Sequence, residues 1–277
     1  MSGTLYLVAT PIGNLGDFSP RAAATLETAD FIAAEDTRVS LKLLNYLGLK
    51  KPLVSYHQHN RASAGAAILE RLLNGEDCAL VTDAGTPAIS DPGEDLVRLC
   101  GENGVPVVSI PGCCALVSAL AVSGLSTGRF TFEGFLSVNK KSRREHLQTL
   151  LEERRTMIFY EAPHKLRATL DDLLAAFGDR PIALCRELTK LHEEVRRTTL
   201  AQAVEYYREN DPKGEFVLVL AGAEPEDGPS VSLENAVALV LERREAGERM
   251  RDAVRQVSAD TGLGRNELYE AALKASQ

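Results

Sequence analysis

A loop with the sequence DAGTPAISDPG, residues 83–93, directly follows the apolar run CALVT and combines glycine, proline and small polar side chains. Gly85 lets the backbone approach a ligand closely, and the prolines stiffen the loop. Asp83 and Thr86 supply polar groups for binding a ribose or an amino acid, whereas Asp91 is expected to cap the helix that follows. The loop is longer than a usual strand-to-helix connection of about 2–6 residues, so it is predicted to bind a ligand.

A second polar loop, TPIGNLGD at residues 10–17, follows the first apolar run, where dinucleotide-binding folds carry their phosphate turn. Gly13 and Gly16 are three residues apart without a third glycine, so the G-x-G-x-x-G pattern is absent, and no G-x-x-x-x-G-K-[ST] motif occurs. These absences argue against NAD-dependent and P-loop chemistry. A cofactor without phosphates, such as S-adenosylmethionine, would need no such cradle.

The segment EDTR, residues 35–38, follows the apolar run FIAA. Asp36 or Thr37 is expected to cap the next helix. Capping does not explain Glu35 and Arg38, which makes them candidates for a functional role at a strand end.

Two further segments carry histidine and acidic side chains at expected strand ends. In YHQHN, His57 and His59 would lie on one side of a continuing strand. Two histidines without a third ligand do not predict a metal site, so RNA contact or proton transfer is favoured. In FYEAPHKL, two arrangements are open: Glu161 and His164 face the same cleft, or His164 lies on the protein surface. Polar groups at several strand ends are typical of a cleft.

The composition is that of an ordinary globular protein, with 277 residues, 44% hydrophobic and 25% charged. No apolar run reaches the roughly 18–20 residues of a membrane helix, and five cysteines without a C-x-x-C pair indicate a cytoplasmic protein with reduced thiols. A net charge of -8 argues against nonspecific coating of nucleic acid. One expected helix nevertheless offers either a basic patch or a merely solvated face: Lys140, Lys141, Arg143 and Arg144, with Arg154 and Arg155 at its other end.

The order of apolar and helical segments predicts an α/β protein. Residues 4–110 alternate short β-branched runs with helical patterns, as in a parallel sheet. The next stretch predicts a mixed sheet, in which PIALCRE and EEVRRTT pair antiparallel because no helix separates them. Three amphipathic helices resembling a helix-turn-helix unit end the chain, with nucleic-acid binding, packing and dimerisation as open roles. The expected divisions are an α/β domain over 1–115, a second over 116–223, a linker over 224–232 and the helical unit over 233–277.

Taken together, TPIGNLGD, AEDTR, SYHQHN, TDAGTPAISDPG, IPGCCALVSAL, FYEAPHKL, RELTKLHEE and KGEFVLVLAG resemble the motif series of the ribosomal RNA small-subunit methyltransferase I family. The resemblance covers almost the whole chain. It implies two consecutive α/β domains of the tetrapyrrole-methylase type, with a cleft for S-adenosylmethionine between them, and a homodimer. The implied reaction is 2′-O-methylation of a cytidine in the decoding centre of 16S ribosomal RNA, within the 30S subunit.

The resemblance also assigns site residues. With Asp83 from the loop itself, the expected cofactor contacts are Pro11, Ile12, Gly13, Ala84, Gly85, Thr86, Ile89, Cys114, Ala115, Leu166 and the strand end at Ala221. Two positions depart from the family pattern: Cys113–Cys114 stands where a Pro or Ala followed by Ser is usual, and Gln58 stands where Glu is expected.

Methyl transfer to a ribose hydroxyl requires alignment of the reacting atoms and removal of a proton. The candidate bases are Glu35, Asp36, His57 and Glu161. The candidate RNA contacts are Arg38, His59, Lys140, Lys141, Arg186 and Lys190.

Two other functions stay open. A methylase of the same superfamily acting on a small tetrapyrrole would share the fold, since fold alone does not decide the substrate. A non-catalytic RNA-binding factor in ribosome assembly is the alternative from another class.

Overall fold

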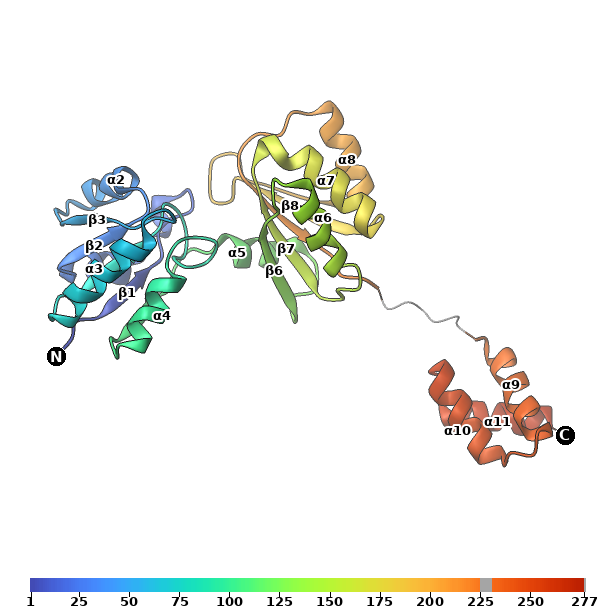
Figure 1. Ribbon diagram of the computed structural model, residues 1–277. Coiled ribbons are helices and arrows are strands. Elements are labelled where there is room, and N and C mark those ends of the chain that lie inside the picture. The colour runs from blue at the N-terminus through green and yellow to red at the C-terminus, as the bar shows by residue number, and fades with distance from the viewer. Residues whose placement is uncertain (225–230, 277) are drawn as a thin grey trace. The chain divides into compact units, whose positions relative to one another are not determined.

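The computed structural model describes residues 1–224 and 231–276. The chain forms two compact units, Met1–Gly222 and Ala223–Gln277 (Figure 1). The expected domain division at residues 115/116 falls inside the first unit and stays a prediction. Most of the linker expected at 224–232 lies outside the described residues.

The first sheet of the larger unit is entirely parallel, as predicted, with strand order β3-β2-β4-β1-β5. Its strands are β1 (Leu5–Val8), β2 (Phe31–Ala34), β3 (Leu53–Ser55), β4 (Cys78–Val81) and β5 (Val107–Ile110). The apolar runs of β2 and β4 are buried along their whole length, because helices cover both faces of the sheet.

Four helices and one 3-10 turn complete this half: η1 (Leu15–Asp17), α1 (Pro20–Thr28), α2 (Thr37–Leu47), α3 (Arg61–Leu73) and α4 (Glu94–Glu102). Leu26 of α1 and Leu44 of α2 pack on one face of the sheet. Ile68 of α3 and Leu96 of α4 pack on the other. Loops after the neighbouring strands β1 and β4 thus leave toward opposite faces, which opens a crevice at the carboxyl ends of the strands.

The second sheet is mixed, as predicted, with strand order β6-β7-β10-β8-β9. Its strands are β6 (Phe130–Phe135), β7 (Thr156–Glu161), β8 (Pro181–Arg186), β9 (Glu194–Thr199) and β10 (Phe216–Leu220). β6 and β7 run parallel, β10 runs antiparallel to both β7 and β8, and β8 and β9 form the expected antiparallel pair.

Helices also cover both faces of this sheet (Figure 1). The helices are α5 (Ala115–Ser123), α6 (Lys140–Thr149), α7 (Pro163–Phe177) and α8 (Leu200–Glu209). Side chains of α6, α7 and α8 share one core with the sheet, and α5 packs on the opposite face. Because α6 ends at Thr149, Arg154 and Arg155 lie beyond it and not at its far end, contrary to the sequence-based expectation.

The smaller unit contains the three predicted helices, α9 (Leu233–Glu245), α10 (Met250–Thr261) and α11 (Arg265–Ala275). Val240, Val254 and Leu268 contribute one side chain from each helix to a shared core. Gly262 ends α10 in the left-handed conformation, with φ of 73°. No helix within residues 1–224 and 231–276 is both long and apolar enough to cross a membrane.

Candidate functional site

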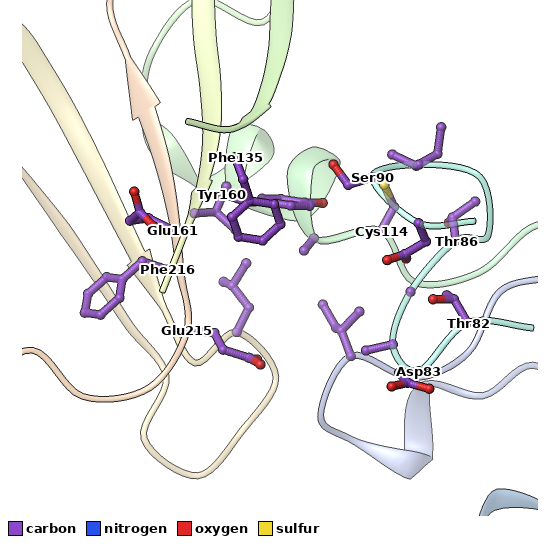
Figure 2. Close-up of a pocket in the computed structure, with 18 of the residues that line it drawn as sticks. Thr82, Asp83, Thr86, Ser90, Cys114, Phe135, Tyr160, Glu161, Glu215 and Phe216 are labelled. Atoms are coloured by element: carbon purple, nitrogen blue, oxygen red, sulfur yellow. The ribbon is translucent and has the colours of Figure 1, made fainter. Parts of the chain in front are cut away.

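A cavity of about 390 Å³ lies in the larger unit, where loops of both sheets come together (Figure 2). This volume falls within the range of about 300–1,000 Å³ that is usual for small-molecule sites. Glu35, Thr82 and Asp91 line it from the loops of the first sheet, and Tyr160 and Glu187 line it from the second. The predicted ligand loop therefore forms one wall of a cavity large enough for a single small molecule.

The loop at residues 83–93 is fixed to its neighbours by hydrogen bonds. Thr10 and Gly85 form a two-way backbone bridge, with N···O distances of 2.8 and 3.1 Å. The Thr86 hydroxyl donates to the Cys113 carbonyl at 2.9 Å. Gly85 has φ of 93°, and a Cβ at this position would lie 3.4 Å from Ile12 Cγ2. A side chain here would thus strain the backbone and intrude on the cavity wall.

Backbone strain concentrates in two loops that line the cavity. In the described part of the chain, the non-glycine residues with positive φ are Ala88, Ser90, Glu187 and Thr189. The first two belong to the loop at 83–93, and the other two follow β8. Such conformations cost on the order of 1–3 kcal/mol each and cluster at ligand sites, so their location supports a functional role for this cavity.

Carboxylates line the first-sheet side of the cavity. The Thr82 hydroxyl donates to Glu35 Oε2 at 2.9 Å. Burial raises the pKa of Asp91 to about 6, and the negative charges of Glu35 and Asp83 add to this rise, while a hydrogen bond with Thr82 opposes it. Burial also raises the pKa of Asp83. This accumulation of negative charge suits a positively charged ligand.

The expectation that Asp91 caps the next helix is wrong. Helix α4 begins only at Glu94, and Gly93 occupies its N-cap position without a side-chain hydrogen bond. Asp91 instead lines the cavity. Because Pro92 and Gly93 separate Asp91 from the first residue of α4, the Asp91 carboxylate is not at the N-cap position.

Lys190 joins two loops of the second sheet by hydrogen bonds and packs against Gly13 of the first. Its ammonium donates to Glu187 Oε1 at 2.8 Å and to Glu215 Oε2 at 2.9 Å. Burial lowers the pKa of Lys190, but these hydrogen bonds outweigh that effect and hold the pKa above its ordinary value. A Cβ at Gly13 would lie 2.4 Å from Lys190 Cγ, so the absence of a side chain at Gly13 lets the two loops pack together.

The second-sheet side of the cavity adds apolar side chains to the charged groups Glu161, Glu187, Lys190 and Glu215. Cys185, Leu188 and Val217 line it beside the Tyr160 ring. The Tyr160 hydroxyl accepts a hydrogen bond from the Leu116 N–H at 3.0 Å, and burial raises the pKa of Tyr160 to about 12. The cavity therefore combines an acidic first-sheet side with a second-sheet side that offers apolar surface beside paired charges.

Most of the residues expected to contact a cofactor line this cavity: Ile12, Asp83, Ala84, Gly85, Thr86, Ile89, Cys114 and Ala115. Pro11 and Gly13 flank Ile12 in the chain.

The structure does not bring Leu166 and Ala221 to the cavity. Leu166 is fully buried in the core that α7 shares with the second sheet. The Ala221 N–H donates to the Pro181 carbonyl at 2.9 Å, at the start of β8. Because β10 runs antiparallel to its neighbours, its first residue, Phe216, lines the cavity, and the cofactor contact expected at Ala221 stays a prediction.

The four candidate bases divide into two groups. Glu35 and Glu161 line the cavity, but Glu161 is 3% exposed and already accepts hydrogen bonds from the Thr169 hydroxyl at 2.5 Å and the Ala162 N–H at 2.9 Å. Asp36 and His57 are not among the residues that line the cavity. Glu35 is thus the candidate best placed to meet a ligand.

Asp36 and His57 have local roles instead. Asp36 caps α2, as expected for this position or the next, and its hydrogen bonds with Arg38 lower its pKa to about 2. Strand β3 ends at Ser55, so His57 and His59 lie in the turn after it, with ring centroids 6.0 Å apart. The expected continuation of this strand is therefore wrong. Among residues 1–224 and 231–276, no cluster of three or more potential ligands is suited to a metal ion.

The candidate RNA contacts lie in several places. Arg38 and His59 are exposed, and Arg38 pairs with Asp36. Lys140 and Lys141 form the exposed first turn of α6. Arg186 pairs with Glu194 at 3.2 Å, and Lys190 lines the cavity.

Arg143, the third member of the expected basic patch, is buried and forms an ion pair with Asp172. The patch on α6 therefore consists of Lys140, Lys141 and Arg144.

Several residues that line the cavity are not predicted from the sequence, among them Phe135, Tyr160 and Glu215 (Figure 2). Phe135 and Tyr160 belong to apolar strand patterns that equally predict core residues. The one usable signal was the glycine in FTFEGF, because a glycine inside a strand indicates a bulge or a close approach.

Comparison with known proteins identifies the family. The model for tetrapyrrole (corrin/porphyrin) methylases matches residues 4–204. Ribosomal RNA small subunit methyltransferase I of Synechocystis sp. is 52% identical over 273 residues, which cover 98% of each chain. The protein of the same name from Halalkalibacterium halodurans is 47% identical over 277 residues, covering 96% of this chain and 93% of the relative.

A solved structure supports the fold. A cobalt precorrin-4 methyltransferase, a cobalamin biosynthetic enzyme, aligns with a TM-score of 0.58 at 19% identity, covering 78% of this chain and 94% of the other. The two sheets and their helices are thus the tetrapyrrole-methylase fold. The chain belongs to the tetrapyrrole methylase family and, within it, to the ribosomal RNA small subunit methyltransferase I family.

Proposed function

We propose that this methyltransferase uses S-adenosylmethionine to methylate the ribose 2′-hydroxyl of a cytidine in the decoding centre of 16S ribosomal RNA. The observation that carries the proposal is the cavity at residues 83–93, which combines the carboxylates Glu35, Asp83 and Asp91 with apolar surface, in a chain 52% identical to a ribosomal RNA small subunit methyltransferase I. When bound, this cofactor supplies the methyl group from a positively charged sulfur.

The charges of the cavity fit that cofactor. The negative charge of Asp83, Asp91 and Glu35 would attract its sulfonium and ammonium groups, which are cationic. Leu188 and Val217 provide apolar surface for the adenine ring of the cofactor. Gly85, which has no side chain, lets the backbone of the loop approach the cofactor closely. Neither glycine-rich phosphate motif occurs in the chain, which agrees with a ligand that lacks phosphates.

The chain must also position the ribose hydroxyl and accept its proton. Asp91 and Glu35 are the groups we assign to this task, because both line the cavity and the negative charge of Glu35 helps to raise the pKa of Asp91. A pKa of about 6 leaves Asp91 ionised at neutral pH but more basic than an ordinary aspartate. Its closeness to Glu35 makes the pair, not either group alone, the acceptor to test.

The RNA contacts of the proposal are Arg38, His59, Lys140, Lys141, Arg186 and Lys190. Lys140 and Lys141 support it best, since both are exposed in the first turn of α6, which follows a strand that ends at the cavity. We extend the proposal to the 30S subunit as substrate, to a homodimer and to a cytoplasmic location.

Radiolabelled S-adenosylmethionine tests this proposal directly. The purified protein is incubated with 16S RNA transcribed in vitro, with 30S subunits assembled from that RNA, and with tetrapyrroles, and labelled nucleotides are mapped. We expect label on one cytidine ribose. Cofactor binding without any label in RNA contradicts the proposal, and label in a tetrapyrrole identifies the small-molecule alternative.

A further inference from the structure

Strand β6 contains a bulge that determines where Phe135 points. The register with β7 pairs Phe132 with Ile158 and Phe135 with Tyr160, so one extra residue lies between them at Glu133. In a regular strand, residues three apart point to opposite faces. Because of the bulge, Phe132 and Phe135 lie on the same face, and bulges next to active sites commonly redirect a side chain in this way.

Both phenylalanine rings contact Tyr160. The ring centroids of Phe132 and Phe135 lie 5.0 and 5.5 Å from that of Tyr160, in T-shaped arrangements. Phe135 nevertheless keeps 55% of its surface exposed at the cavity. The T-shaped contact leaves at least one face of the Phe135 ring uncovered by Tyr160, and Figure 2 shows the two rings together with Ser90 and Cys114 across the cavity.

The bulge also ties β6 to the ligand loop. Gly134 has φ of 62°, and a Cβ there would lie 3.4 Å from Ser90 Oγ. The backbone of β6 thus passes close to the loop at residues 83–93 immediately before Phe135. Among the described residues that line the cavity, Phe135, Tyr160 and Phe216 are aromatic, and of these Phe135 has the exposed ring, which leaves it available to a partner.

The size of the cavity indicates what that partner is. At about 390 Å³ the cavity has room for one small molecule, so a second reactant must approach at its rim, where Phe135 lies. Lys140 and Lys141 begin α6 only five and six residues further along the chain, and they and Arg144 are exposed. No ion pair forms on Lys140 or Arg144 within the parts of the chain that the structure describes. An aromatic platform beside a basic surface is the usual arrangement for an unpaired base of RNA.

We infer that Phe135 is a stacking platform for the unstacked nucleobase of the RNA nucleotide that is methylated. This inference rests on the proposed function. Enzymes that modify a nucleotide commonly take it out of its stack and hold it against aromatic side chains. Tyr160 contacts the ring edge-on, and the bulge at Glu133 directs the ring to the cavity.

Phe135→Ala tests the inference, with Phe135→Tyr as the conservative variant. Phe130→Ala is the matched control, because Phe130 lies at the opposite end of the same strand and is 40% exposed. The readouts are the cofactor dissociation constant by calorimetry, kcat/KM for 16S RNA or 30S subunits, and the fluorescence of RNA with pyrrolocytidine at the methylated position.

We expect Phe135→Ala to lower kcat/KM for RNA about 5- to 150-fold, the range for loss of one base–aromatic stack. Its cofactor dissociation constant stays unchanged, and the quenching of pyrrolocytidine seen with the wild-type protein is lost. Phe135→Tyr retains both activity and quenching, and Phe130→Ala behaves as the wild type. Unchanged RNA kinetics in Phe135→Ala overturn the inference.

A cofactor dissociation constant that rises in parallel with the loss of kcat/KM also overturns it, since the ring would then stack on the cofactor. If the wild-type protein labels no RNA, the proposed function fails separately. The fluorescence then decides about the platform: quenching that depends on Phe135 supports it, and its absence with the wild-type protein overturns it.

Discussion

The two sheets of the larger unit meet the cavity in different ways. In the parallel sheet, all contributions come from loops that follow strands, as with Glu35 after β2 and Asp83 after β4. In the mixed sheet, Glu187 follows β8, but Glu215 and Phe216 stand at the start of β10. The antiparallel direction of β10 reverses which end of this strand faces the ligand.

This difference also divides the chemistry. The parallel sheet supplies Glu35, Asp83 and Asp91, with Asp91 buried enough for its pKa to reach about 6. The mixed sheet supplies the aromatic rings of Phe135 and Tyr160 and much of the apolar surface, and its glutamates Glu187 and Glu215 are paired with Lys190. We therefore expect changes on the first sheet to affect binding of the charged cofactor, and changes at the rim of the second sheet to affect the RNA.

The largest effect is expected for Gly85→Val. A valine would have to adopt a φ of 93° and would approach Ile12 Cγ2. Overpacking of this kind costs about 1–3 kcal/mol, so the cofactor dissociation constant should rise about 5- to 150-fold by calorimetry.

Gly48→Val is the matched control for this prediction. Gly48 has φ of 70°, and no heavy atom lies within 4 Å of a Cβ built there. This variant should lose stability from backbone strain and keep its cofactor affinity. Equal loss of affinity in both variants would show that strain in the fold, not the cavity wall, causes the effect.

The loop around Gly85 was predictable because parallel strands place all their ligand loops at one edge, so a strand-loop-helix pattern suffices to locate them. The end of β10 that lines the cavity was not predictable, because the sequence does not reveal the direction of this strand within the mixed sheet. Asp91 was expected to cap α4 because a short polar side chain before a helix usually has that role. The N-cap is in fact Gly93, two residues after Asp91, and only the backbone conformation shows where the helix begins. The direction of Phe135 depends on the bulge at Glu133, which no periodicity predicts.

Asp91→Asn should remove a pH dependence of cofactor binding. A cationic ligand prefers the ionised carboxylate, so affinity rises as Asp91 loses its proton around its pKa of about 6. Between pH 5 and pH 7 the ionised fraction, and with it the apparent affinity, increases about tenfold. Calorimetry at both values should show this increase in the wild-type protein only; an equal increase in Asp91→Asn would assign it to another group.

The same substitution should stabilise the protein without ligand. Because burial raises the pKa of Asp91 from 3.8 to about 6, the folded state binds this proton more tightly than the unfolded state does. The carboxylate therefore destabilises the fold increasingly as pH rises from about 4 to 6, and fully above that range. Denaturant unfolding should show a gain in stability for Asp91→Asn at pH 7 and none near pH 3. A gain that is independent of pH would contradict this explanation.

The smallest effect on cofactor binding is expected for Val217→Ala, with Val219→Ala in the same strand as its control. Val217 lines the cavity from the first half of the strand, whereas Val219 lies on the same face two residues further along and is fully buried in the same core. Truncation of either side chain to alanine removes a similar amount of buried apolar surface, so both variants should lose comparable stability. Only Val217→Ala should weaken cofactor binding, by about two- to fivefold, since removal of roughly one methyl group from contact with a ligand costs about 0.8 kcal/mol. If Val219→Ala weakened binding equally, the end of β10 that faces the cofactor would be the one at Ala221, and the contrast between the two sheets would be lost.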